Sequence, residues 1–146
     1  MQATSGDKSY ILKKIFMKDV ACEAPKGAEA MLMPKGPPAV SVDVGGKSER
    51  VRDNLWEVEL SLNITLQINQ TPVFAVEIYQ AGLFECEGLS EAELHRVLNT
   101  DCMETLFPYA RETIDSLIVK AGFPAISLQP VNFHGLYAQA MAEQAK

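Results

Sequence analysis

The chain has 146 residues, a formal net charge of −6 at pH 7 and 47% hydrophobic residues. This length predicts a single domain over residues 1–146, with flexible ends at 1–9 and 143–146. The negative charge argues against nucleic acid as a partner, because nucleic-acid binding needs a basic face. The sequence contains neither a membrane-length apolar run of ~18 residues nor a signal-peptide core, so we expect a cytoplasmic protein without direct membrane insertion.

The first predicted element is a strand from Ile11 to Glu23. Strict alternation would put Leu12 and Phe16 on one face and Ile15 and Met17 on the other. Neither face is cleanly polar, so we expect both faces to contact protein.

An irregular loop is predicted at residues 26–39, which contain three prolines and two glycines. The run Met31–Met33 lies in this loop, and flexible thioether side chains are suited to gripping unlike surfaces. The alternative is that the loop packs these side chains into its own core.

Three further strands are predicted before the first helix. Val40–Val44 alternates, and Gly45-Gly46 is predicted to turn the chain. Trp56–Ile68 alternates without interruption, with apolar residues at the even positions and polar residues at the odd ones. A tight turn at residues 69–72 leads to an antiparallel partner, Val73–Glu85.

Three helices are predicted after the strands. Ser90–Glu93 reads as the capping box of a short helix. A long helix has an apolar stripe at three-and-four spacing, with Pro108 expected in its first turn and Gly122 as its C-cap. The last helix begins at the N-cap Asn132 and runs to about Gln144. Strands followed by helices predict an α+β fold, a four-stranded antiparallel sheet with helices packed on one face.

No enzyme motif is found in the sequence. His95 and His134 stand alone, and there is no glycine-rich phosphate loop. Cys22, Cys86 and Cys102 share no metal-ligand spacing, and three cysteines fit a reducing compartment. We therefore expect no catalytic residue, no cofactor and no metal.

Two blocks of the sequence carry recognisable motifs. The later block contains LFPYARE from Leu106, G-FP at residues 122–124 and L-x-PVNF at residues 128–133. The earlier block is KKIFMKDVACEAP at residues 13–25. In these motifs the chain resembles SecB, the family of bacterial protein-export chaperones, and the resemblance extends from about Ile11 to Met141.

The resemblance implies a function and an assembly. We expect an ATP-independent holdase that binds unfolded precursor proteins and delivers them to SecA, the export motor. We also expect a homotetramer built as a dimer of dimers. The apolar stripe of the long helix is our candidate for the subunit contacts. Its members are Leu106, Phe107, Ala110, Ile114, Leu117 and Ile118.

An apolar groove is the expected client site. The exposed apolar residues of the loops suggest it, and the resemblance implies that residues 26–39 wall it. The family usually has an aromatic residue near Gly36, where this chain reads Lys-Gly-Pro-Pro. The candidate groove residues are Met31, Leu32, Met33, Val40, Val42, Leu128, Val131, Phe133, Leu136, Tyr137 and Met141.

A negative patch is the second expected site. Asp19 and Glu23 share parity on the first strand, and Glu77 lies on the polar parity of the fourth. The resemblance implies that these three residues and the neighbouring Ala75 hold the basic, zinc-binding tail of SecA.

Two other functions stay open. One is a SecB-like chaperone of a toxin–antitoxin system, which would be expected to lack the patch. The other is a small protein that binds an apolar ligand in a closed cavity.

Overall fold

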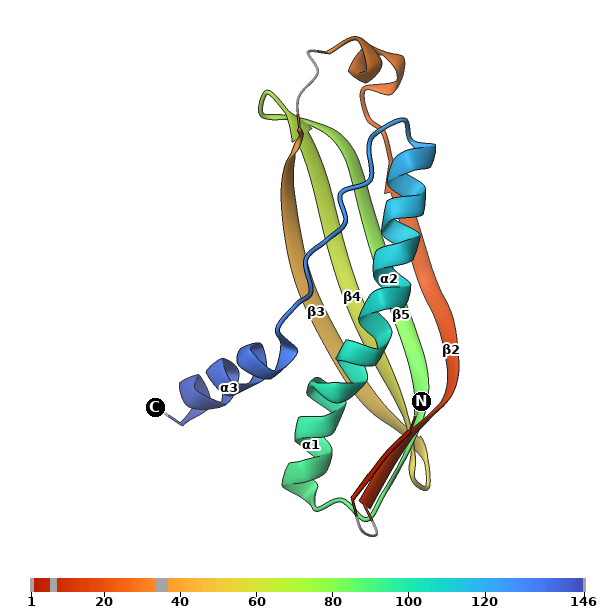
Figure 1. Cartoon of the computed structure of the whole chain (residues 1–146), viewed down its shortest axis with the longest axis vertical. Coiled ribbons are helices and arrows are strands. Elements are labelled where there is room, and N and C mark those ends of the chain that lie inside the picture. The colour runs from red at the N-terminus through yellow and green to blue at the C-terminus, as the bar shows by residue number, and fades with distance from the viewer. Residues whose placement is uncertain (1, 6–7, 34–36, 146) are drawn as a thin grey trace.

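The structure, a computed structural model, describes residues 2–5, 8–33 and 37–145. Within these residues, antiparallel strands form one sheet in the order β1-β2-β5-β4-β3, and helices pack on one face of it (Figure 1). The predicted α+β fold is confirmed, with β1 as a short addition to the four long strands. The elements are β1 (Gln2–Ser5), β2 (Lys8–Glu23), η1 (Gly27–Leu32), β3 (Ala39–Arg52), β4 (Leu55–Ile68), β5 (Thr71–Glu87), α1 (Glu91–Asn99), α2 (Asp101–Lys120) and α3 (Phe133–Gln144).

Two sequence expectations fall wholly or partly outside the described residues. The first concerns the position near Gly36, where the family usually has an aromatic residue and this chain has none; residues 34–36 are not described. The flexibility expected at 1–9 and 143–146 stays a prediction. The strand β1 was not expected from the sequence. None of the helices in the described ranges combines the length and hydrophobicity that crossing a bilayer requires.

The hairpin of β4 and β5 is the centre of the sheet and agrees with its prediction. The even-numbered side chains of β4 from Val58 to Leu66 are fully buried, because a period of two keeps them all on the face that α2 covers. Asn69 and Gln70 both have positive φ, and Ile68 pairs with Thr71. The turn therefore has two central residues in the left-handed region, as tight hairpins require.

The predicted turn at Gly45-Gly46 is wrong. β3 continues through both glycines to Arg52, and the chain turns after it, where Asp53 has a φ of 49°. The glycines serve close packing instead of a turn. A Cβ on Gly46 would lie 2.4 Å from Cε of Met103, so α2 approaches the sheet where Gly46 has no side chain.

The strict alternation predicted for the first strand is also wrong. β2 pairs with β5 through two irregularities, between Leu12 and Lys14 and between Met17 and Asp19. Each β-bulge adds one residue, and the side chains after it change faces. Ile15 consequently pairs with Gly82 on the helix-covered face.

The helix ends largely follow the predicted caps. Ser90 Oγ accepts a hydrogen bond from the Glu93 N–H at 3.1 Å, and the Glu93 carboxylate accepts from the Ser90 N–H at 3.0 Å, so the capping box is confirmed. Asn132 caps α3 by accepting from the Gly135 N–H at 3.0 Å. Pro108 was expected in the first turn of its helix, but α2 begins at Asp101 and Pro108 lies in its interior.

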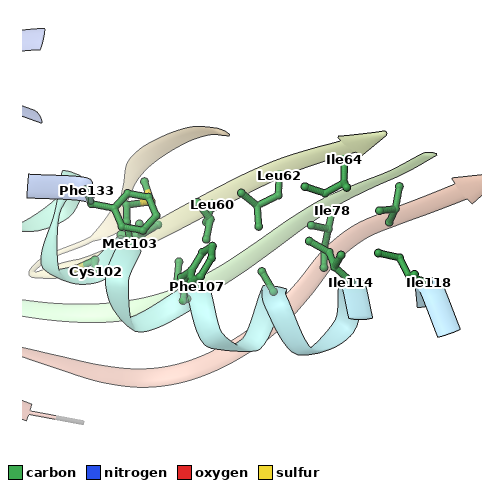
Figure 2. Close-up of a cluster of buried hydrophobic side chains, with 14 of the residues drawn as sticks. Leu60, Leu62, Ile64, Ile78, Cys102, Met103, Phe107, Ile114, Ile118 and Phe133 are labelled. Atoms are coloured by element: carbon green, nitrogen blue, oxygen red, sulfur yellow. The ribbon is translucent and has the colours of Figure 1, made fainter. Parts of the chain in front are cut away.

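The apolar stripe of α2 lies in the core of its own chain (Figure 2). Its side chains point at Leu60, Leu62, Ile64 and Ile78 of the central hairpin. The prediction that this stripe forms subunit contacts is therefore corrected, because a side chain sealed against the sheet has no surface left for a partner. Leu117 alone of the six is half-buried, and the buried members are Leu106, Phe107, Ala110, Ile114 and Ile118.

Candidate functional sites

A large apolar pocket lies between η1 and the end of α2. We call it the η1 pocket; its volume is about 710 Å³, and Met31, Met33 and Val40 are among its lining residues. Residues 122–126 form the opposite wall. Gly122 has a φ of 95°, and a Cβ there would lie 2.9 Å from Sδ of Met31. A glycine at this position therefore both ends α2 and admits the methionine.

A smaller pocket lies where α3 meets the sheet. We call it the α3 pocket; its volume is about 200 Å³, and Phe133, Leu136 and Tyr137 line it together with Met103. The ring of Tyr137 is held in place, because its hydroxyl lies 2.7 Å from Nδ1 of His95.

Three valines of β3 join the two pockets, and we call them the valine track. Val40, Val42 and Val44 are 41%, 41% and 38% exposed. They pair with Leu66, Ile64 and Leu62 of β4, which places them on the helix-covered face. β3 is the edge strand and α2 lies over β5 and β4, so the helix does not reach the track (Figure 1).

The segment after α2 runs along the same face towards α3 (Figure 1). The Asp115 carboxylate accepts hydrogen bonds from the N–H groups of Ile126, at 3.0 Å, and Ser127, at 3.2 Å. The segment is thus tied to α2, and Ile126 is one of the residues that line the η1 pocket. A wall fixed in this way keeps the pocket open without a ligand.

The predicted groove residues divide among several places. Met31, Met33 and Val40 line the η1 pocket, and Phe133, Leu136 and Tyr137 line the α3 pocket. Val42 lies between the pockets on β3. Leu128 and Val131 are half-buried against the core, while Leu32, at 86% exposed, and Met141, at 42%, line neither pocket.

Some lining residues were missed in the sequence. Val44 continues the alternation of Val40 and Val42 and could have been found from it. Phe123 and Ile126 lie in the same proline-stiffened segment as Leu128. Met103 was not among the predicted groove residues, since sequence spacing does not reveal that Gly46 lies beside it.

The acidic patch, defined as Asp19, Glu23, Ala75 and Glu77, lies on the opposite face of the sheet. In the register of β2 and β5, Asp19 pairs with Tyr79, Ala21 with Glu77 and Glu23 with Ala75. Glu77 is therefore diagonal to both other carboxylates, at a typical spacing of roughly 7–8 Å. The structure brings the four predicted residues together, beside a hollow of about 200 Å³.

Within the described residues, no ion pair neutralises the carboxylates of the acidic patch. Among the described residues, no basic side chain lies within 4.0 Å of them. The nearby Lys18 contacts Glu57 at 2.8 Å and Glu59 at 3.1 Å instead, which raises the pKa of its amine. The Tyr79 hydroxyl donates to Glu77, and this bond raises the pKa of Tyr79. The charge of the acidic patch is therefore negative and attracts positively charged groups.

Comparisons with known proteins agree on one family. The family model described as "Preprotein translocase subunit SecB" matches residues 3–144. The Protein-export protein SecB of Hahella chejuensis is 43% identical over 135 residues, covering 92% of this chain and 84% of its own length. That of Methylococcus capsulatus is 38% identical over 140 residues, covering 94% and 90%.

A solved structure shares the fold. It is a SecB-like chaperone of Mycobacterium tuberculosis in complex with a peptide from an antitoxin, with a TM-score of 0.69 and 18% identity. The match covers 84% of this chain and 89% of that one. With the fold and the sequence matches in agreement over nearly the whole length, the chain belongs to the SecB family.

Proposed function

We propose that this protein is a cytoplasmic, ATP-independent holdase that binds unfolded precursor proteins and passes them to SecA. The observation that carries this proposal is the valine track, an aliphatic surface that stays about 40% exposed between two apolar pockets. An extended apolar segment is the partner that such a surface suits. Burying its apolar area supplies roughly 25 cal/mol per Å², without any requirement for a particular client sequence.

Assembly into a homotetramer is part of the proposal. Several tracks acting on one client raise its effective concentration, which strengthens binding without new contacts. The buried stripe of α2 is not available for the contacts between subunits. Exposed apolar side chains elsewhere are better candidates, and they include Tyr109 and Val119 on the outer side of α2 and Met17 and Val20 on β2.

The antitoxin-related function has weaker support. The solved relative with an antitoxin peptide is 18% identical, whereas the export proteins reach 43%. The acidic patch also favours export, because it offers a docking surface for a basic partner.

Replacing Val42 with aspartate is expected to weaken binding of an unfolded, signal-bearing precursor by about tenfold. The change removes apolar contact worth ~1.5 kcal/mol and sets a charge in the track. Binding is measured by fluorescence anisotropy with a labelled precursor held unfolded. The matched control is Val51→Asp, on the same strand and 56% exposed but outside the track.

The native mature form of the same precursor is the second control. A holdase is expected to bind the unfolded precursor and not to bind the folded form. Equal affinity for the unfolded and the folded form would contradict the proposal. An equal loss of precursor affinity in Val42→Asp and Val51→Asp would show that the valine track is not the binding surface.

Replacing Glu77 with lysine is expected to weaken binding of the zinc-loaded SecA tail by about tenfold at low salt. The change reverses a charge that lies diagonal to Asp19 and Glu23, which adds repulsion as it removes attraction. The loss should shrink as salt rises, because ions screen exposed charges. The measurement is isothermal titration with the tail peptide.

The control for this test is Glu85→Lys. Glu85 is half-buried like Glu77 and lies on the same strand and face, but it pairs with Ile11 at the far end of β2. Affinity for the tail that is unchanged in Glu77→Lys would rule out docking at the acidic patch. Thermal unfolding of each variant shows that the chain is still folded.

A further inference from the structure

Two helices bring an imidazole and two carboxylates together outside the sites described above. Asp101 and Glu104 lie in the first turn of α2, and His134 lies in the first turn of α3. Nε2 of His134 is 3.3 Å from Oδ1 of Asp101 and 3.5 Å from Oε1 of Glu104. One ligand atom from each of the three residues lies within 4.8 Å of the others. We call these three residues the His134 cluster.

The two short distances in the His134 cluster have the size that a shared metal ion requires. Zinc binds histidine nitrogen and carboxylate oxygen at about 2.0–2.2 Å. Two such ligands separated by a tetrahedral angle lie about 3.3–3.6 Å apart. The pairs His134–Asp101 and His134–Glu104 already have this spacing. The ligand atoms of Asp101 and Glu104 lie within 4.8 Å of each other. The Glu104 side chain is 49% exposed, so it can rotate to adjust this distance.

The backbone holds the cluster in place. Asp101 and Glu104 are three residues apart on α2, so they share one helix face. Phe133, the residue before His134, is 5% exposed. Its ring packs edge-on against the ring of Phe107, with 6.2 Å between the ring centroids, and this contact anchors the start of α3. The residue after His134 is also held, because the N–H of Gly135 donates a hydrogen bond to the Asn132 side chain. The ligands are thus arranged before any ion binds.

The charge of the cluster also favours a cation. Within the described part of the chain, neither Asp101 nor Glu104 lies within 4.0 Å of a lysine or arginine nitrogen. With a neutral imidazole, the His134 cluster carries two negative charges. The dipole of α2 opposes part of this attraction, because its positive end lies beside the two carboxylates.

We propose that the His134 cluster binds one divalent transition-metal ion and so fastens α3 to the start of α2. Zinc fits best, because one imidazole and two carboxylates with an open fourth position form a donor set that it accepts. Calcium and magnesium prefer oxygen ligands only. No metal was expected from the sequence. Glu104 and His134 are thirty positions apart, so no local spacing of ligands reveals the cluster. This inference rests on the geometry of the cluster and is independent of the proposed holdase function.

The site would act on the α3 pocket. Leu136 and Tyr137 of α3 line that pocket, and they follow His134 within one turn. An ion that ties His134 to α2 therefore fixes the helix that forms one wall of the pocket.

The test is a titration of the metal-free, full-length protein with zinc chloride by calorimetry, and with cobalt chloride by absorption spectroscopy. We expect one ion per chain and the visible bands of tetrahedral cobalt. His134→Ala and Asp101→Asn are each expected to weaken binding by about a hundredfold, since even residues that only orient a ligand contribute 10–100-fold. Folding of each variant is checked by circular dichroism.

The control separates this site from other donors. Cys22→Ser removes the exposed thiol, and this variant should bind zinc as tightly as the original chain. Binding that survives His134→Ala overturns the proposal. Absence of zinc and cobalt binding to the folded chain also overturns it, and the cluster is then an ion pair only.

A second measurement tests the fastening of α3. Hydrogen exchange of the α3 amides is expected to slow on addition of zinc in the original chain and to stay unchanged in His134→Ala. Zinc binding without any slowing of exchange in α3 would overturn the fastening role.

Discussion

Replacing Leu106 with aspartate is expected to abolish cooperative folding of the chain. Leu106 of α2 is fully buried against the sheet. It packs so closely on Gly82 that a Cβ on that glycine would lie 3.0 Å from Cδ2 of Leu106. A charge at this position would lack a partner and water. The cost exceeds about 4–5 kcal/mol, a large part of the 5–15 kcal/mol that a domain of this kind has in total. Thermal and urea unfolding followed by circular dichroism measure the loss.

A milder variant keeps the effect measurable. Leu106→Ala should remain folded and lower the free energy of unfolding by about 3 kcal/mol, since it leaves a cavity under α2. The control is Glu112→Ala, an exposed residue of the same helix, which should change stability by less than about 1 kcal/mol.

The Leu106 variants also decide between two roles for the stripe. If Leu106 formed a contact between subunits, as the sequence suggested, Leu106→Asp would give a well-folded chain of lower mass in light scattering. A folded, smaller species would contradict the core position of Leu106. Loss of the cooperative transition supports it.

Replacing Gly82 with valine is expected to destabilise the chain by about 3 kcal/mol. A Cβ on Gly82 would lie 2.8 Å from Cε2 of Phe84 and 3.0 Å from Cδ2 of Leu106, both closer than packed carbon atoms allow. The ring of Phe84 is fully buried and has little room to move. Added carbon atoms therefore push α2 away from the sheet, at the upper end of the 1–3 kcal/mol that overpacking costs.

The matched control for Gly82→Val is Gly45→Val. Both glycines lie within strands, but a Cβ on Gly45 would meet Oγ of Ser61, a small side chain that can rotate away. Valine is also favoured over glycine in an exposed strand. This gain should nearly cancel the cost of the contact with Ser61, so the stability of Gly45→Val should change little. Equal destabilisation by the two changes would show that the space beneath α2 is not the cause.

The central hairpin and the helix caps could be predicted from the sequence because their signals are local. Alternation from Trp56 to Ile68 specifies a strand with one buried face. Ser90 and Glu93 are three residues apart and specify a helix start by themselves. The resemblance then supplied the family, which the comparisons confirm.

The errors have a common physical cause, which is contact between residues far apart in the sequence. Gly45-Gly46 has the composition of a turn, yet its lack of side chains serves the packing of Met103. An apolar helix stripe looks the same whether its own sheet or another subunit covers it. The bulges in β2 arise from pairing with β5, which no periodicity in β2 alone reveals.

The candidate sites were found in part for the same reason. Parity on two strands sufficed for the acidic patch, because β2 and β5 are neighbours. The groove list included Leu128 and Val131, which turned out half-buried against the core. Its η1 wall and its α3 wall come from segments about a hundred residues apart, and only the fold brings both to one face.

The two bulges of β2 also guard the molecule against fibre formation. In each bulge the extra residue is a lysine, Lys13 in one and Lys18 in the other, and β1 pairs with β2 only from Lys8 to Ile11. The rest of the outer edge of β2 is therefore kinked at two places, each marked by a lysine. Irregular, lysine-bearing edges discourage a foreign strand from docking and starting an amyloid-like stack.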